Sequence, residues 1–198
     1  MGNAENTSNE PNPGDITPLL APLQALQNLI SEFGDQGVII GGIASSLLGT
    51  PRYTADVDAV LLLSSERLPE LLQAATRQGI RPRIQDAEAF ARKNRVLLLR
   101  HSASGVDIDL ALGFLPFESE MVARSQLITI GAVNLRLPTV EDMIILKAVA
   151  HRPKDLEDIQ AMVANHPTID RTRIRIWVEQ FGQALDMPEL WEMIAGLL

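Results

Sequence analysis

The feature that most constrains this chain is a pair of aspartates at the start of an apolar stretch, residues 56–63 (DVDAVLLL). The apolar run predicts a buried β-strand, along which successive side chains alternate between faces, so Asp56 and Asp58 point the same way. Two carboxylates at the mouth of a buried strand cost free energy unless something pairs with them. The alternative is that Asp56 closes a turn while Asp58 lies at a solvated strand end. We favour a metal site.

A second acidic strand supports that interpretation. Residues 106–112 (VDIDLAL) place Asp107 and Asp109 on one face of their own predicted strand. If the two acidic strands are neighbours, three carboxylates converge, and such a cluster repels itself unless a cation lies in it. Oxygen ligands of this kind favour Mg²⁺ or Mn²⁺ over zinc. We choose Asp109 over Asp107 as the third ligand, although alternation alone leaves that choice open.

A glycine pair precedes the first acidic strand. Gly41 and Gly42 follow a short apolar strand and lead into a predicted helix of small residues. Backbone N–H groups and the helix dipole can meet a phosphate at such a turn, although a glycine pair also marks tight packing. Arg52 and Thr54 come just before the aspartates, and Arg52 either pairs with a triphosphate or is an ordinary loop arginine.

One lysine lies within an apolar helical pattern. Lys147 occurs in the stretch PTVEDMIILKAVAHR, and a buried lysine requires an anionic partner. We expect that partner to be the phosphates of a ligand, and the alternative is a structural ion pair with an aspartate. The three histidines do not have the mutual spacing of a zinc site.

The chain divides by pattern into three parts. Residues 1–16 are polar and rich in Asn, Pro and Gly, which predicts a disordered segment. Strands and helices alternate over residues 17–137, and residues 138–198 are helical, so we expect an α/β (α+β) fold with a helical C-terminal portion. The expected strands are 38–40, 56–63, 96–99, 106–112, 127–130 and 133–137. The expected helices are 17–33, 43–48, 65–78, 86–93, 117–124, 139–150, one opening near 153, 171–185 and 187–198.

Composition narrows the function. The 198 residues carry a formal charge of −8, which argues against binding duplex nucleic acid over the whole surface. There are no cysteines, which excludes disulfides, thiolate zinc sites and cysteine nucleophiles. A signal peptide and a membrane-length apolar span are not evident, so we expect a soluble cytoplasmic protein without membrane contact.

The basic residues are unevenly distributed. Seven of the 17 Lys and Arg residues fall between Arg77 and Arg100, where only Asp86 and Glu88 oppose them. This asymmetry predicts a local docking surface for a polyanion such as the 3′ end of an RNA. The alternative is an exposed basic region that has no ligand.

Taken together, these motifs resemble the nucleotidyltransferase fold superfamily, which includes DNA polymerase beta. They are most similar to the bacterial AbiEii-type nucleotidyltransferases, among which toxins of toxin–antitoxin systems are found. The resemblance covers about residues 38–159. The matching pieces are GGIA at residues 41–44, RYTADVD at 52–58, VDIDL at 106–110 and PTVEDMIILKAVAHRPKDLEDI at 138–159.

The resemblance implies a mixed β-sheet flanked by helices and transfer of a nucleoside monophosphate from an NTP such as ATP to an acceptor hydroxyl. It assigns Asp56, Asp58 and Asp109 to Mg²⁺ or Mn²⁺, with Asp109 also helping to deprotonate the acceptor. It gives nucleotide contacts to the residues Gly41, Gly42, Ser45, Arg52, Thr54 and Lys147. Many superfamily members have Gly-Ser where this chain has Gly-Gly, and Ser45 or Ser46 would supply the missing hydroxyl.

Three functions follow from this resemblance. The first is an NTP transferase acting on RNA or on a protein hydroxyl, as a toxin with a partner antitoxin. The second is a small-molecule enzyme of the aminoglycoside-modifying kind, which predicts an acidic acceptor pocket. The third is a non-catalytic relative that binds a nucleotide or a partner protein.

Overall fold

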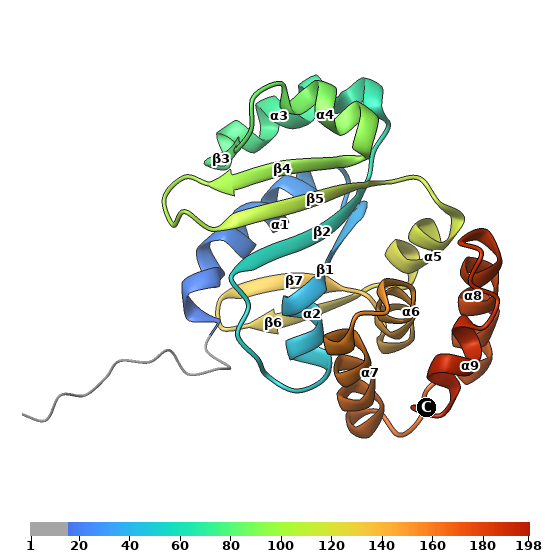
Figure 1. Ribbon diagram of the computed structural model, residues 1–198. Coiled ribbons are helices and arrows are strands. Elements are labelled where there is room, and N and C mark those ends of the chain that lie inside the picture. The colour runs from blue at the N-terminus through green and yellow to red at the C-terminus, as the bar shows by residue number, and fades with distance from the viewer. Residues whose placement is uncertain (1–15) are drawn as a thin grey trace, which may run out of the picture.

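The computed structural model describes residues 16–198, so nearly all of the segment expected to be disordered (1–16) lies outside the described residues. Helices gather at two ends of a central β-sheet (Figure 1). Helices α3 and α4 lie beside strands β3 and β4, and α5 to α9 lie at the other end. The helices are α1 (Leu20–Glu32), α2 (Gly41–Leu48), α3 (Leu68–Arg77), α4 (Ala87–Asn94), α5 (Pro116–Arg124), α6 (Val140–Ala150), α7 (Pro153–Asn165), α8 (Arg171–Ala184) and α9 (Leu190–Ala195). Short 3₁₀ turns precede α1 and α3.

The central sheet has five strands in the order β1-β2-β5-β4-β3. Strands β2 and β5 are parallel, and the other neighbouring pairs are antiparallel. The two acidic strands are therefore adjacent at the centre of a mixed sheet, which confirms the expected fold class. The strands of this sheet are β1 (Gly37–Ile40), β2 (Asp56–Leu62), β3 (Ile80–Pro82), β4 (Val96–His101) and β5 (Asp107–Gly113).

A separate hairpin packs against the first strand and the first helix. Within residues 16–198, strands β6 (Gln126–Ile130) and β7 (Val133–Leu137) pair only with each other, and β7 contacts β1 and α1. Both strands were expected, at residues 127–130 and 133–137, and Gly131 between them has a φ of +59° that suits the turn. From this hairpin the chain enters α6, whose N-cap Thr139 accepts a hydrogen bond from the Asp142 N–H.

Some element boundaries differ from those expected. Helix α2 begins at Gly41 rather than at residue 43, because Gly41 adopts a φ of +66° and turns the chain directly from strand into helix. Strand β3 was not expected, since three residues ending in proline carry little pattern. The final helix covers only Leu190–Ala195 instead of residues 187–198.

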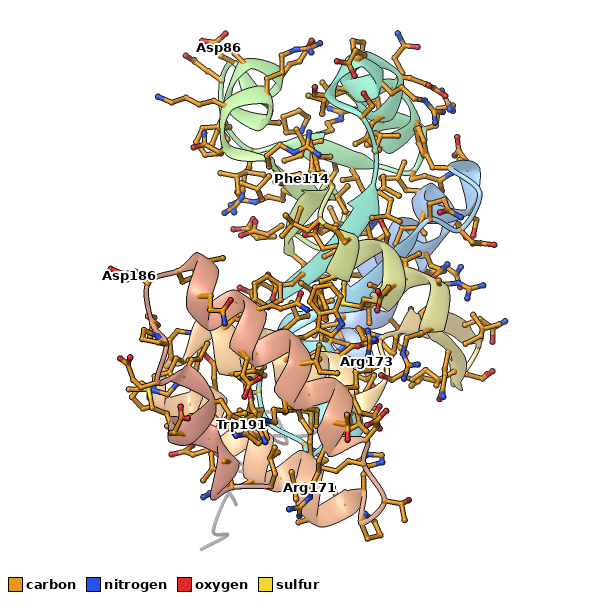
Figure 2. All side chains as sticks on the ribbon, turned by 90° about the vertical axis from the view of Figure 1, so that its right-hand side faces the viewer. Asp86, Phe114, Arg171, Arg173, Asp186 and Trp191 are labelled. Atoms are coloured by element: carbon orange, nitrogen blue, oxygen red, sulfur yellow. The ribbon has the colours of Figure 1, made fainter. Side chains whose placement is uncertain are left out.

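The buried apolar residues form one continuous cluster that runs from α1 through the sheet to α9. An edge-to-face aromatic contact joins α5 to α8, where the ring of Phe117 lies 5.2 Å from that of Trp177. Arg173, labelled in Figure 2, joins the same helices to α6 through ion pairs with Glu120 and Asp142. Within residues 16–198, no helix is both long and apolar enough to cross a lipid bilayer.

Candidate active site

The predicted aspartates meet in one cavity. Strand register places Asp58 directly opposite Asp109 and Asp56 opposite Asp107. Three of these four residues, Asp56, Asp58 and Asp109, line a cavity of about 600 Å³, together with residues of α2, α6 and α7. Asp107 lies beside the cavity rather than in its wall, and a hydrogen bond from Arg100 lowers its pKa.

The surroundings of Asp58 disfavour the charged form of its carboxylate. Burial raises its pKa, and the nearby charges of Asp56 and Asp109 raise it further, while a hydrogen bond from the Gly42 N–H lowers it. Gly41 gives this side chain its space, because a Cβ at Gly41 would lie 1.9 Å from Oδ2 of Asp58. The turn at the start of α2 and the carboxylate of Asp58 thus pack directly against each other.

In this structure the carboxylate of Asp109 is paired with Arg83. Its guanidinium forms ion pairs with the carboxylates of both Asp107 and Asp109. As the side chains stand in residues 16–198, no group of three His, Asp or Glu residues is arranged to hold a metal ion. The donor chemistry nevertheless fits Mg²⁺ or Mn²⁺, because the carboxylates of Asp56 and Asp109 lie close enough to Asp58 to raise its pKa.

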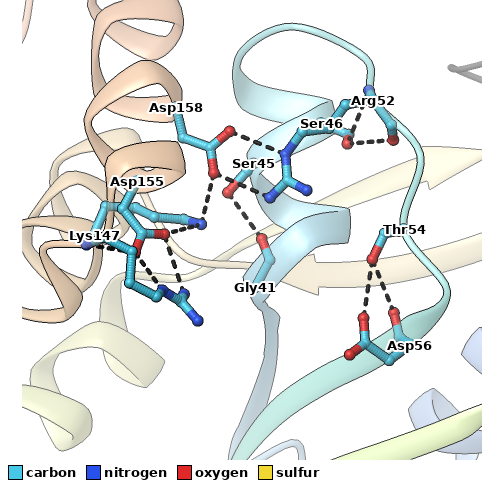
Figure 3. Close-up of polar contacts among 10 residues, drawn as sticks. Gly41, Ser45, Ser46, Arg52, Thr54, Asp56, Lys147, Asp155 and Asp158 are labelled. Carbon is cyan, nitrogen blue, oxygen red and sulfur yellow. Dashed lines mark hydrogen bonds and ion pairs between the residues drawn. The ribbon is translucent and has the colours of Figure 1, made fainter.

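The loop before β2 is held by its own hydrogen bonds (Figure 3). The Thr54 hydroxyl donates to the Asp56 carboxylate at 3.1 Å, and Thr54 also lines the cavity. Ser45 does not reach the cavity: it is 2% exposed, and its hydroxyl donates to the Gly41 carbonyl at 2.9 Å. Ser46 likewise faces the loop, donating to the carbonyl of Arg52 at 3.2 Å. Neither serine replaces the hydroxyl of a Gly-Ser turn in this structure.

Lys147 lies in a buried ion-pair network, which Figure 3 shows. Its Nζ is 2.9 Å from Asp155 and 2.7 Å from Asp158, and the lysine is only 4% exposed. Arg52 binds Asp158 in a bidentate manner at 3.0 and 3.1 Å, and Arg152 binds Asp155 at 2.6 Å. The structural ion pair that was the alternative for Lys147 is therefore present. Arg52 pairs with one of the same aspartates, and both cations also line the cavity.

These contacts change the pKa of the two aspartates. Burial raises the pKa of Asp155, but hydrogen bonds from Arg152 and Lys147 outweigh it and lower the pKa from 3.8 to about 2. For Asp158, burial acts in the same direction and is likewise outweighed by Arg52 and Lys147. Both carboxylates are therefore charged at neutral pH, and three cationic side chains surround them.

The sequence did not point to three of the polar residues that line the cavity. Tyr53 is 64% exposed at the cavity wall, and Arg152 and Lys154 add positive charge from the start of α7. Their positions within the RYTADVD and HRPKD stretches, next to residues already chosen, were the only signal available. Asp158, which joins Arg52 to Lys147, was also missed.

Most of the predicted basic surface is internally paired. Arg83 and Arg100 bind Asp107, Arg77 binds Glu32, and Arg92 binds Glu88. The guanidinium of Arg95 donates to the carbonyl of Leu112 and stacks over the Phe114 ring. In the described part of the chain, the remaining two, Arg81 and Lys93, are exposed and have no ion-pair partner.

Comparisons with known proteins agree with this geometry. The chain matches the family "Nucleotidyltransferase of unknown function (DUF6036)" over residues 19–180. A comparison with curated protein sequences finds no match. Among solved structures, the chain is similar to an antigenic nucleotidyltransferase-like protein from Paracoccidioides brasiliensis, with a TM-score of 0.56 and 16% identity, over 91% of this chain and 95% of that one.

The antibiotic-resistance factor ANT(2'')-Ia is similar to the same degree. Its solution structure gives a TM-score of 0.56 at 15% identity, over 90% of this chain and 98% of that one. Its crystal structure in complex with adenylyl-2"-tobramycin gives 0.54 at 16%, over 86% and 99%. At such identities these structures show a shared fold, and none of them confirms the AbiEii-type subfamily. The family match covers most of the sequence, so the chain belongs to this nucleotidyltransferase family and is an enzyme of the nucleotidyltransferase class.

Proposed function

We propose that this enzyme uses a divalent cation, Mg²⁺ or Mn²⁺, to transfer a nucleoside monophosphate from an NTP to an acceptor hydroxyl. The observation that carries the proposal is the convergence of Asp56, Asp58 and Asp109 at one cavity that also holds the N-terminus of α2. Carboxylates suit a cation, and a helix N-terminus suits a phosphate. The carboxylates and the helix N-terminus that a metal–triphosphate site would require thus line the same cavity.

The residues have separable roles in this proposal. Asp56 and Asp58 hold the cation, and Asp109 completes the site and accepts the proton of the attacking hydroxyl. The acceptor oxygen bonds to the α-phosphorus while the bond to pyrophosphate breaks. When bound, the cation lowers the pKa of the hydroxyl and neutralises the triphosphate.

The remaining cavity groups bind and orient the nucleotide. Gly41 and Gly42 let the triphosphate approach the backbone at the start of α2. Lys147 and Arg52 supply positive charge to the cavity wall, and so do the more exposed Arg152 and Lys154. Thr54 keeps the Asp56 carboxylate in place. Such positioning supplies much of the catalysis in reactions of this type.

A small hydroxyl compound is the acceptor class that these observations favour. The cavity volume is in the range of small-molecule sites. The basic region that would attract RNA is mostly neutralised by the chain's own groups, and the protein is acidic overall. The neighbour solved with adenylyl-2"-tobramycin adds an aminoglycoside hydroxyl as the first acceptor to test.

An RNA 3′ end, or a protein hydroxyl, is the second candidate. It is favoured by Arg81 and Lys93, two exposed cations without an ion-pair partner in residues 16–198, which lie in the segment of high basic content. A toxin role with a partner antitoxin belongs to this second candidate, and so does the AbiEii-type subfamily.

The test is transfer of label from each α-³²P NTP in the presence of Mg²⁺. Separate reactions contain an aminoglycoside panel, total RNA, or a protein lysate. We expect label on a small hydroxyl compound, and loss of that label in Asp58→Ala. The matched control is Glu157→Gln, which alters an exposed carboxyl on α7 and leaves transfer intact. Absence of label in every reaction contradicts the proposal, and label on RNA or protein alone selects the second candidate.

A further inference from the structure

Arg83 is the one cation of the predicted basic surface that reaches the aspartates of the cavity. It follows β3, and its backbone N–H donates to the Leu98 carbonyl of β4 at 3.1 Å, so its main chain is fixed to the sheet. Its side chain is partly buried, and its Nε has no hydrogen-bond partner among the described residues. A partly buried guanidinium at this edge of the sheet requires acidic partners.

Those partners are two aspartates with different surroundings. One amino group of Arg83 lies 3.1 Å from Oδ2 of Asp107, and the other contacts Oδ1 of Asp109. The second oxygen of Asp107 accepts a hydrogen bond from Arg100 at 2.6 Å. In the described part of the chain, the Asp109 side chain has no hydrogen-bond partner other than Arg83.

Two cations, Arg83 and a divalent metal ion, can therefore compete for the carboxylate of Asp109. A divalent ion shared with Asp58, its neighbour across the strands, must compete with the guanidinium for the same carboxylate. Asp107 offers Arg83 a place to remain when Asp109 is released, because one arm of the guanidinium is already bound there. The planar guanidinium of arginine, with two terminal nitrogens, can bridge two carboxylates in this way.

We propose that Arg83 is a positioning residue that holds Asp109 in the metal-free enzyme and withdraws to Asp107 when a divalent cation binds. Arg83 thereby weakens binding of the cation by the free protein. This inference rests on the proposed function only in taking Asp109 as a cation ligand.

The experiment measures Mn²⁺ binding to the full chain without nucleotide or acceptor, by the loss of the electron paramagnetic resonance signal of free Mn²⁺. We expect Arg83→Gln to bind Mn²⁺ roughly three- to tenfold more tightly than the wild type, since a positive charge in direct contact with a ligand is removed. The matched control is Arg100→Gln, which removes a charge from Asp107 but not from Asp109, and we expect a change of less than about twofold.

A double-mutant cycle separates this role from a general effect of charge. In an Asp109→Asn background, Arg83→Gln is expected to leave Mn²⁺ affinity unchanged. A residue with a merely structural role would lower the midpoint of thermal unfolding without tightening Mn²⁺ binding. If Arg83→Gln does not fold, Arg83→Met decides the matter, because it removes the positive charge while keeping an unbranched apolar side chain, and Mn²⁺ binding should again tighten.

Several outcomes overturn the proposal. These are unchanged or weaker Mn²⁺ binding in the folded Arg83 variant, equal tightening by Arg100→Gln, persistence of the effect without Asp109, or no Mn²⁺ binding by any variant. Tighter binding in Arg83→Gln alone, together with no nucleotidyl transfer by the wild type, supports the role of Arg83 and contradicts the proposed function. The two failures are thus distinguishable.

Discussion

At the scale of single residues, the charged form of Asp58 destabilises the folded protein, although the proposed function requires that charge. Because burial and two neighbouring carboxylates raise its pKa above the unfolded value, the proton binds the folded state more tightly. The stability contributed by protonated Asp58 is therefore present at low pH and is lost as the pH rises through the folded-state pKa. A neutral side chain of the same shape should recover it.

We therefore expect Asp58→Asn, without divalent cation at pH 8, to raise the midpoint of thermal unfolding by about 2–4 °C and to reduce transfer at least about 100-fold. Near pH 4 the difference in midpoint should shrink. Differential scanning calorimetry across this range is the measurement, with Glu157→Gln as the control that should change neither quantity. If Asp58→Asn is less stable than the wild type at pH 8, the charge of Asp58 does not destabilise the folded protein and the prediction is wrong.

At the scale of elements, the start of α2 is a strand-to-helix turn that leaves no room for a side chain. Gly41→Ala would both strain a left-handed backbone and drive a methyl group into Asp58. We expect it to destabilise the protein by more than about 1 kcal/mol and to abolish most transfer. Gly34→Ala has the same backbone sign, a φ of +73°, with nothing within 4 Å. It should cost about 1 kcal/mol and leave transfer intact, as measured by urea unfolding and by label transfer.

The junction between α6 and α7 rests on Lys147. Removing its charge in Lys147→Met leaves Asp155 and Asp158 with less compensation, so we expect a loss of about 3–5 kcal/mol in the free energy of unfolding. Because the pKa of Asp155 is lowered to about 2, the stability that Asp155 contributes is present above its unfolded value of 3.8 and is lost as the pH falls through about 2.

The kinetic readout distinguishes the two roles of Lys147. If it binds the triphosphate, the rise in KM for the NTP in Lys147→Met exceeds that in Asp155→Asn, which breaks the same network without removing a cation. Equal effects on KM would leave Lys147 with the structural role alone.

The pattern of the sequence was sufficient to predict the two acidic strands. It was insufficient to predict which residues contact one another across the fold. Strand alternation predicted that Asp56 and Asp58 share a face, because the period of two is a local property. The register that pairs Asp58 with Asp109 depends on which strands are neighbours, which alternation does not specify. Lys147 and Arg83 contact their aspartates through the tertiary structure. The spacing of residues in the sequence therefore could not predict whether each cation pairs with an aspartate or with a ligand.

At the scale of the whole molecule, the expected boundary between residues 17–137 and 138–198 is crossed by a continuous core. Phe117 of α5 is 1% exposed and packs edge to face on Trp177 and Phe181 of α8. Both tryptophans of the chain, Trp177 and Trp191, lie in the helical portion, so tryptophan fluorescence reports on that side of the boundary. Amide hydrogen exchange of β2 and β5 reports on the other side.

We expect urea unfolding to give the same midpoint by both measurements, because separate units would require a break in the apolar cluster. Phe117→Ala should lower both midpoints together, by about 3–5 kcal/mol in the free energy of unfolding. The matched control is Phe114→Ala, three residues earlier and 66% exposed, which should cost less than about 1 kcal/mol. A fluorescence midpoint that falls alone in Phe117→Ala would make residues 138–198 an independent unit. The cavity between the acidic strands and α6 would then open without unfolding of the sheet.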